Sequence, residues 1–235
     1  MKKLLLMFIL LPNILLSQID EEFRSVNNLS STLWEGDTEK FIINSDKKLQ
    51  LNDSDEGSAM LRIKTQLSDY IHWKIKLNLD FNPSANNYLK ISLLKSEEKE
   101  LFALVGKNND KIELYFSDIN GEQIIAYSEE DFLSFSKQNL LFNIIKLNDE
   151  WSFNIKNNET ELNLNFTQNF KFFEAESFEF ECFYTKTRAD KFEFEYFLIE
   201  KLNIGDNIPP KLLELNIINK NTISLSFSER LAQFK

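Results

Sequence analysis

The sequence contains little cysteine, histidine, glycine or proline: one, one, five and four residues respectively in 235. A single cysteine cannot form an intrachain disulfide, which excludes the disulfide-rich scaffolds. One histidine and one cysteine also exclude most zinc sites, Ser-His-Asp triads and Cys-His pairs within this chain. The low glycine content excludes collagen-like sequences.

Basic residues are in the minority as well. Lys and Arg number 27 against 37 Asp and Glu, so the formal net charge is −10. A nucleic-acid-binding surface needs an excess of positive charge, and no nucleic-acid partner is expected. Hydrophobic residues make up 43% of the chain. That share is enough for one sizeable core and excludes intrinsic disorder.

The longest apolar run lies at the N-terminus. Two lysines follow Met1, the apolar run spans residues 4–16, and Ser17 and Gln18 come next. This order is typical of a secretory signal peptide. We predict that residues 1–17 form a signal peptide cleaved between Ser17 and Gln18, and that the protein is secreted or displayed on the outer cell surface. An N-terminal anchor is the alternative, but a membrane span needs roughly 20 apolar residues. No later run approaches that length, so no span is expected after cleavage.

A polar lead over residues 18–31 precedes a long region in which apolar and polar residues alternate. In 72–81 the odd positions are apolar and the even ones polar, which predicts a strand with one buried face. Similar strands are predicted at 40–44, 48–52, 59–65, 88–94, 101–107, 111–117, 122–128, 139–147, 151–156, 161–166, 178–184 and 191–201. Asn, Asp and Gly separate them, most clearly at Asn120-Gly121. This spacing predicts an all-β fold, an antiparallel β-sandwich over residues 32–205. The one helical candidate is 129–137, with a loop as the alternative.

The composition changes near the C-terminus. Residues 206–211 contain Pro209 and Pro210, which cannot donate hydrogen bonds to a sheet, and we predict a linker there. Residues 212–235 contain two further strands, at 212–218 and 222–227. Two strands cannot bury a core alone. We therefore predict that 212–235 holds the first strands of a truncated second domain.

Several short motifs lie along the chain: Trp34-Glu35-Gly36-Asp37 with Phe41, the segment 49–52, Trp73 with 80–84 and 86–88, the segment 182–192, the 206–210 linker and Phe227-Ser228-Glu229. These motifs resemble those of a family of exported Bacteroidetes proteins that carry bacterial immunoglobulin-like and lamin-tail domains. The resemblance covers roughly residues 34–229. It implies a laminin-G or concanavalin-like jelly roll followed by an immunoglobulin-like domain, downstream domains on the same polypeptide, and often type IX secretion. It implies no established catalytic residues.

Two pairs of glutamates are candidates for glycoside hydrolysis. Glu179 and Glu181 share one strand face, and Glu193 and Glu195 share another. Glycosidases use two carboxyl groups that face one sugar. Both pairs alternate with phenylalanine, however, and this pattern also describes the solvated face of an ordinary strand. We favour the solvated face.

Four other residues are candidates for metal or ligand binding. Asp53 and Asp55 lie in an acidic turn whose oxygens could bind calcium, although a plain turn is the preferred interpretation. Arg188 and Asp190 lie at the tip of a predicted hairpin, 184–192. That tip could contact a ligand, or it could be a structural turn whose charges pair with neighbours.

Trp34 is the tryptophan expected to be most exposed, because it lies outside the clearest strands. It could stack on a sugar ring, but a buried anchor is the better interpretation for all three tryptophans.

These observations predict an exported, non-catalytic β-sandwich module that binds a glycan or a surface protein, or that presents other domains. The alternatives are a jelly-roll glycoside hydrolase that uses a glutamate pair, and a purely structural spacer. No cofactor is expected apart from calcium at the acidic turn.

Overall fold

The computed structural model describes residues 19–23, 29, 34–67, 69–167, 175–202, 212–219 and 222–227. The chain divides into two compact units, Met1–Leu202 and Asn203–Lys235. Four sequence predictions concern residues outside the described ranges: the signal peptide, its cleavage between Ser17 and Gln18, most of the 18–31 lead, and the 206–211 linker. Within the described residues, no helix is long and apolar enough to cross a membrane.

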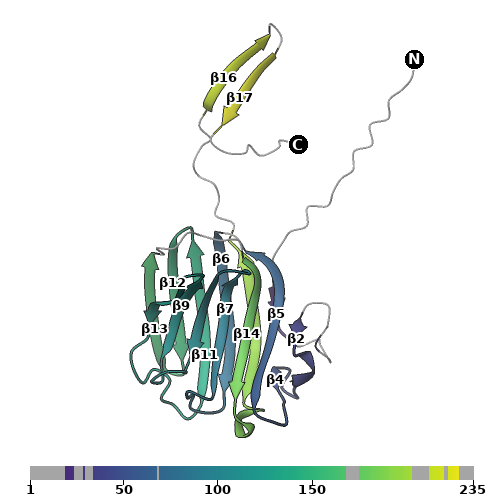
Figure 1. Cartoon of the computed structure of the whole chain (residues 1–235), viewed down its shortest axis with the longest axis vertical. Coiled ribbons are helices and arrows are strands. Elements are labelled where there is room, and N and C mark those ends of the chain that lie inside the picture. Colours follow the sequence, from purple (N-terminus) through teal and green to yellow (C-terminus); the bar gives the residue numbers. More distant parts are fainter. Residues whose placement is uncertain are drawn as a thin grey trace, which may run out of the picture. The chain divides into compact units, whose positions relative to one another are not determined.

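The first unit consists of two antiparallel sheets packed face to face (Figure 1). The eight-stranded sheet has the order β13 (Thr160–Thr167), β12 (Glu150–Asn157), β11 (Gln138–Leu147), β6 (Tyr70–Leu79), β15 (Phe192–Lys201), β4 (Leu49–Leu51) and β3 (Phe41–Ile43), with β1 (Ile19–Glu21) also paired to β15. The seven-stranded sheet has the order β10 (Gly121–Tyr127), β9 (Ile112–Asp118), β8 (Glu100–Val105), β7 (Tyr88–Lys95), β14 (Ala175–Tyr184), β5 (Gly57–Leu67) and β2 (Glu35–Gly36). The all-β, antiparallel sandwich is thus confirmed.

Alternation in the sequence decides which side chains enter the core. In β6, Trp73, Ile75 and Leu77 are fully buried between the sheets, while Lys74 and Lys76 point to the outer face. Burial of such apolar side chains is the main favourable term in folding. One hydrophobic cluster therefore fills the space between the two sheets.

The predicted strands lie within a few residues of the observed ones. Sequence alternation missed β1 and β2, which have three and two residues, and also two 3₁₀ turns, η1 (Thr38–Lys40) and η2 (Lys186–Arg188). Residues 129–137 form turns and bends, so the helix is wrong and the loop is correct. The Asn120-Gly121 hairpin is confirmed: Gly121 pairs with Asp118 and adopts a φ of 117°, which suits glycine.

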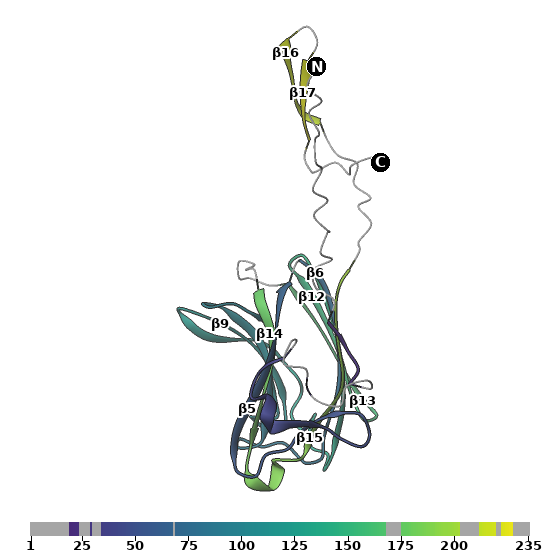
Figure 2. The same ribbon diagram turned by 90° about the vertical axis from the view of Figure 1, so that its right-hand side faces the viewer.

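The segment 184–192 is not a hairpin. β14 pairs with β5 and β7 in the seven-stranded sheet, whereas β15 pairs with β6, β4 and β1 in the eight-stranded sheet. The segment therefore crosses from one sheet to the other, and η2 makes the turn (Figure 2). Arg188 and Asp190 accordingly lie on an inter-sheet connection.

The second unit contains one described hairpin, β16 (Leu212–Asn219) paired with β17 (Thr222–Phe227). Its register places Leu215 opposite Leu225 and Ile217 opposite Ile223. Both strands agree with the sequence prediction. An isolated two-stranded hairpin is marginally stable in water.

Candidate functional site

A polar pocket of about 540 Å³ lies on the outer face of the eight-stranded sheet. This volume is within the range of about 300–1,000 Å³ that is common for small-molecule sites. Its lining comes from β4, β6, β11 and β15 and from the turns beside them. The lining residues are Lys48, Gln50, Asn78, Leu79, Asp80, Lys137, Gln138, Asn139, Asn158, Asp190, Lys191, Glu193 and Glu195. The glutamate pair of β15 and Asp190 thus meet in one site.

The local sequence of β15 explains why both glutamates face the pocket. Phe192 and Phe194 are fully buried, so Glu193 between them points outward. A bulge interrupts the pairing of β15 with β6 between Phe194 and Tyr196. The bulge turns the two consecutive residues Glu195 and Tyr196 toward the outer face, an arrangement that is frequent next to functional sites.

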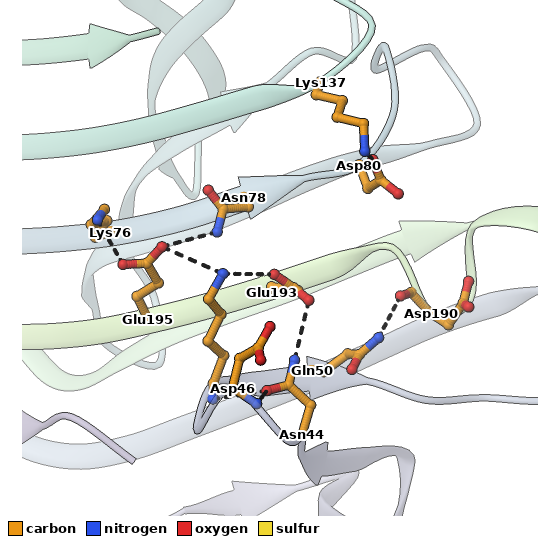
Figure 3. Close-up of polar contacts among 11 residues, drawn as sticks. Asn44, Asp46, Gln50, Lys76, Asn78, Asp80, Lys137, Asp190, Glu193 and Glu195 are labelled. Carbon is orange, nitrogen blue, oxygen red and sulfur yellow. Dashed lines mark hydrogen bonds and ion pairs between the residues drawn. The ribbon is translucent and has the colours of Figure 1, made fainter. Parts of the chain in front are cut away.

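Lysines and two amides hold the two carboxylates, and one of the amides, Asn44 Nδ2, donates to Glu193 Oε1 at 3.1 Å (Figure 3). Lys48 Nζ lies 3.0 Å from Glu193 Oε2 and 3.5 Å from Glu195 Oε1. Lys76 Nζ lies 2.7 Å from Glu195 Oε2, and Asn78 Nδ2 donates to Glu195 Oε1 at 3.1 Å. The pocket therefore presents ionised acceptors and cationic donors fixed on rigid strands.

The pKa of Glu195 argues against acid catalysis by this group. Burial raises the pKa of the Glu195 carboxyl, but the bonds and charges of Lys76, Asn78 and Lys48 outweigh burial and leave that pKa below its ordinary value. Glycoside cleavage needs one carboxyl group that is protonated at the start. Glu195 is ionised at neutral pH, so it is arranged to accept hydrogen bonds rather than to donate a proton.

The other glutamate pair lies on the outer face of the seven-stranded sheet. Glu179 is 5% exposed. Its carboxylate accepts a bond from Lys95 Nζ at 2.6 Å and one from Ser177 Oγ at 2.8 Å. Glu179 is thus the buried member of an ion pair whose lysine is half-buried, and the solvated-face interpretation is wrong for this residue.

Charged pairs stand at the end of the polar pocket where β6 and β15 meet their connecting turns. Lys137 pairs with Asp80, and Lys191 Nζ lies 3.1 Å from Asp190 Oδ2. Gln50 Nε2 donates to the carbonyl of Asp190 at 2.8 Å. Asp190 therefore borders the pocket while it pairs with its neighbour, as the structural-turn interpretation expects.

Arg188 lies outside the pocket lining. Its guanidinium carbon is 5.7 Å from the centroid of the Phe81 ring, a cation–π contact that anchors the connection to the sandwich.

Trp34 is buried, with 2% of its surface exposed. Its ring centroid lies 5.5 Å from those of Phe180 and Phe197 and 6.5 Å from that of Phe23. The expectation of partial exposure is wrong, and the buried-anchor interpretation is correct. A ring packed in this way has no free face for a sugar.

Asp53 and Asp55 link their own turn to the segment that begins at Tyr184. Asp53 Oδ2 accepts a 2.6 Å bond from the Tyr184 hydroxyl and lies 3.3 Å from Lys40 Nζ. Lys186 Nζ lies 3.1 Å from Asp55 Oδ1. Both carboxylates thus face donors, and the part of the chain that the structure describes has no group of three or more side chains suited to a metal ion.

The Asp53–Tyr184 bond predicts an acid-dependent stability. The bond from Tyr184 is the main cause that lowers the pKa of Asp53 to about 2, from an ordinary value of about 3.9. A lowered folded-state pKa stabilises the protein above pH of about 4, and this stabilisation is lost as the pH falls toward 2. Tyr184→Phe should lower the free energy of unfolding at pH 7 by about 1.5 kcal/mol, the value for a bond to a charged group.

Urea unfolding at pH 7, 4 and 2.5 checks this expectation. The difference between wild type and Tyr184→Phe should be smaller at pH 2.5 than at pH 7, because Asp53 of the unfolded chain binds a proton below a pH of about 4 and this removes stabilisation from the folded wild type. A difference that stays constant across this range would contradict the assigned bond.

The outer face of the seven-stranded sheet carries a second cluster of side chains that sequence analysis missed. Tyr88 stacks on Phe183 with ring centroids 4.3 Å apart, and Phe102 stacks on Tyr115 at 5.4 Å. Lys90 Nζ lies 4.2 Å from the centroid of Phe102. Figure 2 shows β9 turning outward from β14 and β5, so the sheet curves around this face. We call these four rings the ring cluster.

The ring cluster had a recognisable signature in the sequence. Residues 101–105 are apolar at every position, which is typical of a strand covered on both faces. Phe102 is accordingly 2% exposed although it points away from the main core. The amides of the polar pocket had no such signature, because only the strand register brings them together.

The sequence matches no established family and no curated protein. The fold is nevertheless similar to solved structures. The exoplasmic/lumenal domain of VIP36 in its Ca²⁺/Man-bound form aligns with a TM-score of 0.57 and 10% identity, over 92% of this chain and 98% of that one. Lectin I-B4 from Griffonia simplicifolia, in a metal-free form, aligns with a TM-score of 0.55 and 8% identity, over 75% of this chain and 97% of that one.

A Bacteroides ovatus protein described as xyloglucan PUL GH43B aligns with a TM-score of 0.52 and 12% identity, over 79% of this chain but 40% of its own. At these identities the similarity defines the fold. The first unit has the same fold as these structures, a two-sheet antiparallel β-sandwich of the jelly-roll type, and the jelly-roll expectation is confirmed.

Proposed function

We propose that the sandwich is a non-catalytic module that binds a neutral glycan in the polar pocket. The observation that carries this proposal is the pocket lining, which combines carboxylates, amides and lysines on rigid strands. Sugar hydroxyls both donate and accept hydrogen bonds, and bonds to ionised partners are the stronger ones. Fixed acceptors such as Glu193 and Glu195 suit hydroxyl recognition.

The similar structures support this class of ligand. VIP36 was solved in Ca²⁺/Man-bound and Ca²⁺/Man3GlcNAc-bound forms, and the Griffonia protein is described as a lectin. Fold similarity alone does not transfer a ligand. It does make a glycan a better first choice than a peptide for a pocket of this polarity.

We also propose that the module works in an exported, multidomain protein. The signal-peptide pattern of residues 1–17 supports export. The separate unit Asn203–Lys235 supports a following domain, because the two-stranded hairpin described in it would be only marginally stable by itself. An immunoglobulin-like domain is the type that the sequence resemblance implies.

Affinity gel electrophoresis of the purified protein through mannan, xyloglucan and mixed-linkage β-glucan tests glycan binding. At least one polymer should retard the wild-type protein. Glu193→Gln should weaken that binding tenfold or more. A charge-assisted hydrogen bond contributes about 1.5–3 kcal/mol, and tenfold corresponds to about 1.4 kcal/mol.

The matched control is Glu200→Gln, a carboxylate on the same strand and face that pairs with His72 outside the pocket. It should bind like wild type. Tyr115→Ala tests the ring cluster in the same assay. Binding that survives Glu193→Gln but is lost in Tyr115→Ala would move the site to the other sheet. No retardation by any polymer would contradict glycan binding.

A further inference from the structure

The strand register places five polar side chains in one row across the sheet. Gln50 pairs with Glu193, Glu193 with Asn78, and Asn78 with Asn139. The backbone N–H of Asn158 donates to the backbone carbonyl of Asn139 at 3.2 Å, so Asn158 continues the row into the next turn. All five residues line the polar pocket. We call them the polar row.

The polar row is long compared with one sugar. Neighbouring strands lie about 4.8 Å apart, so four intervals span about 19 Å. A sugar ring with its two linking oxygens measures about 5 Å, from bonds of about 1.5 Å. The row therefore has the length of three or four sugar rings placed end to end across the strands.

Charged pairs border the polar row on both sides. Figure 3 shows Lys76 and Glu195 on one side of Asn78 and Glu193, and Asp80 and Asp190 on the other. Each of the four carboxylates that line the pocket has a lysine within ion-pair distance. The row thus forms the floor of a channel. The carboxylates that line this channel are already paired with lysines, so a charged polymer would have to break an ion pair to enter.

The composition of the pocket also favours a ligand of several units. Among the described residues that line the pocket, none is aromatic, so a sugar gains no ring stacking there. Hydrogen bonds between uncharged groups contribute little net free energy each. Useful affinity then requires many such bonds, made by successive sugars along the row.

We propose that the pocket holds an internal stretch of a linear, uncharged polysaccharide, three or four sugars long and running across the strands, rather than a single terminal sugar. This proposal rests on the proposed glycan binding and specifies its ligand. The amides of Asn78, Asn139 and Asn158 donate and accept along the chain, and Glu193 accepts between Gln50 and Asn78.

Isothermal titration with size-fractionated fragments tests the proposal. The probe is whichever of mannan, xyloglucan or mixed-linkage β-glucan retards the protein most, cut into linear fragments of one to six backbone sugars. Affinity should rise at least tenfold from one sugar to four and then level off. Borohydride reduction of the fragment end should leave the affinity of six-sugar fragments unchanged, because the site binds internal sugars.

Variants on the two sides of the central Asn78 separate a channel from a single-sugar site. Gln50→Ala and Asn139→Ala should each weaken binding of six-sugar fragments by about threefold or more. Asn163→Ala is the control, an exposed amide on the same face outside the pocket, and it should bind like wild type. Equal affinity for one sugar and for four would overturn the channel and leave glycan binding intact. Failure of every polymer to bind would overturn both.

Discussion

Replacing Phe180 by alanine is expected to lower the free energy of unfolding by about 3–5 kcal/mol, the usual cost of removing a buried phenylalanine ring. Phe180 is fully buried at the centre of the sandwich. Its ring centroid lies 4.3 Å from that of Phe194, 5.2 Å from that of Phe197 and 5.5 Å from that of Trp34. These partners come from the opposite sheet and from the segment before β2, so the ring joins three separate parts of the chain.

Urea unfolding followed by tryptophan fluorescence measures the effect. Glu176→Gln is the matched control, because Glu176 lies on the same strand and is exposed. It should change the free energy of unfolding by less than about 0.5 kcal/mol. Similar losses in the two variants would mean that the assigned facing of β14 is incorrect.

The positions of the strands could be predicted from the sequence, because alternation is a local property. Each predicted strand of the sandwich corresponds to an observed one, and Trp73, Ile75 and Leu77 enter the core as their spacing indicates. Which strands pair is not local. β14 and β15 are neighbours in sequence and belong to opposite sheets, and alternation is identical for a hairpin and for a crossover between sheets.

The candidate site was predictable in part for the same reason. Glu193 and Glu195 could be identified because they alternate with phenylalanine and therefore face outward, and Asp190 because it lies in a predicted turn. The four amides of the polar row could not be identified, because they meet Glu193 only through the pairing of five elements that lie up to 143 positions apart in the sequence. These amides are Gln50, Asn78, Asn139 and Asn158. A single sequence carries no record of that register.

Burial of charge was the other feature that alternation could not show. The segment 139–147 contains apolar residues on both faces, so its facing is ambiguous. In β11, Leu140, Phe142 and Ile144 point into the core, and Lys146 continues this face with a fully buried side chain. A lysine in such a position needs acceptors that lie elsewhere in the fold.

Lys146→Met should therefore destabilise the sandwich by about 1.5–3 kcal/mol, the range for bonds to a charged group. Lys146 Nζ lies 2.8 Å from Asp69 Oδ1 and donates to the carbonyl of Asn148 at 2.6 Å. These contacts tie the β5–β6 turn to the β11–β12 turn. Methionine keeps much of the side-chain volume and removes the charge. The loss of stability therefore measures the contacts of Lys146 with the two turns rather than the cost of a cavity.

Two measurements distinguish this tie from general packing. In Lys146→Met, hydrogen exchange at the Asn148 amide, which donates to the carbonyl of Asp69 at 2.9 Å, should become faster than in wild type. Lys156→Met is the control on the neighbouring strand, where the side chain is 53% exposed, and its effect should stay within about 0.5 kcal/mol. Buried ion pairs can be replaced by apolar groups without loss in some proteins. If Lys146→Met has the stability and exchange rate of wild type, the Lys146–Asp69 pair is also replaceable in this way. That result would contradict a role for the pair in holding the two turns together.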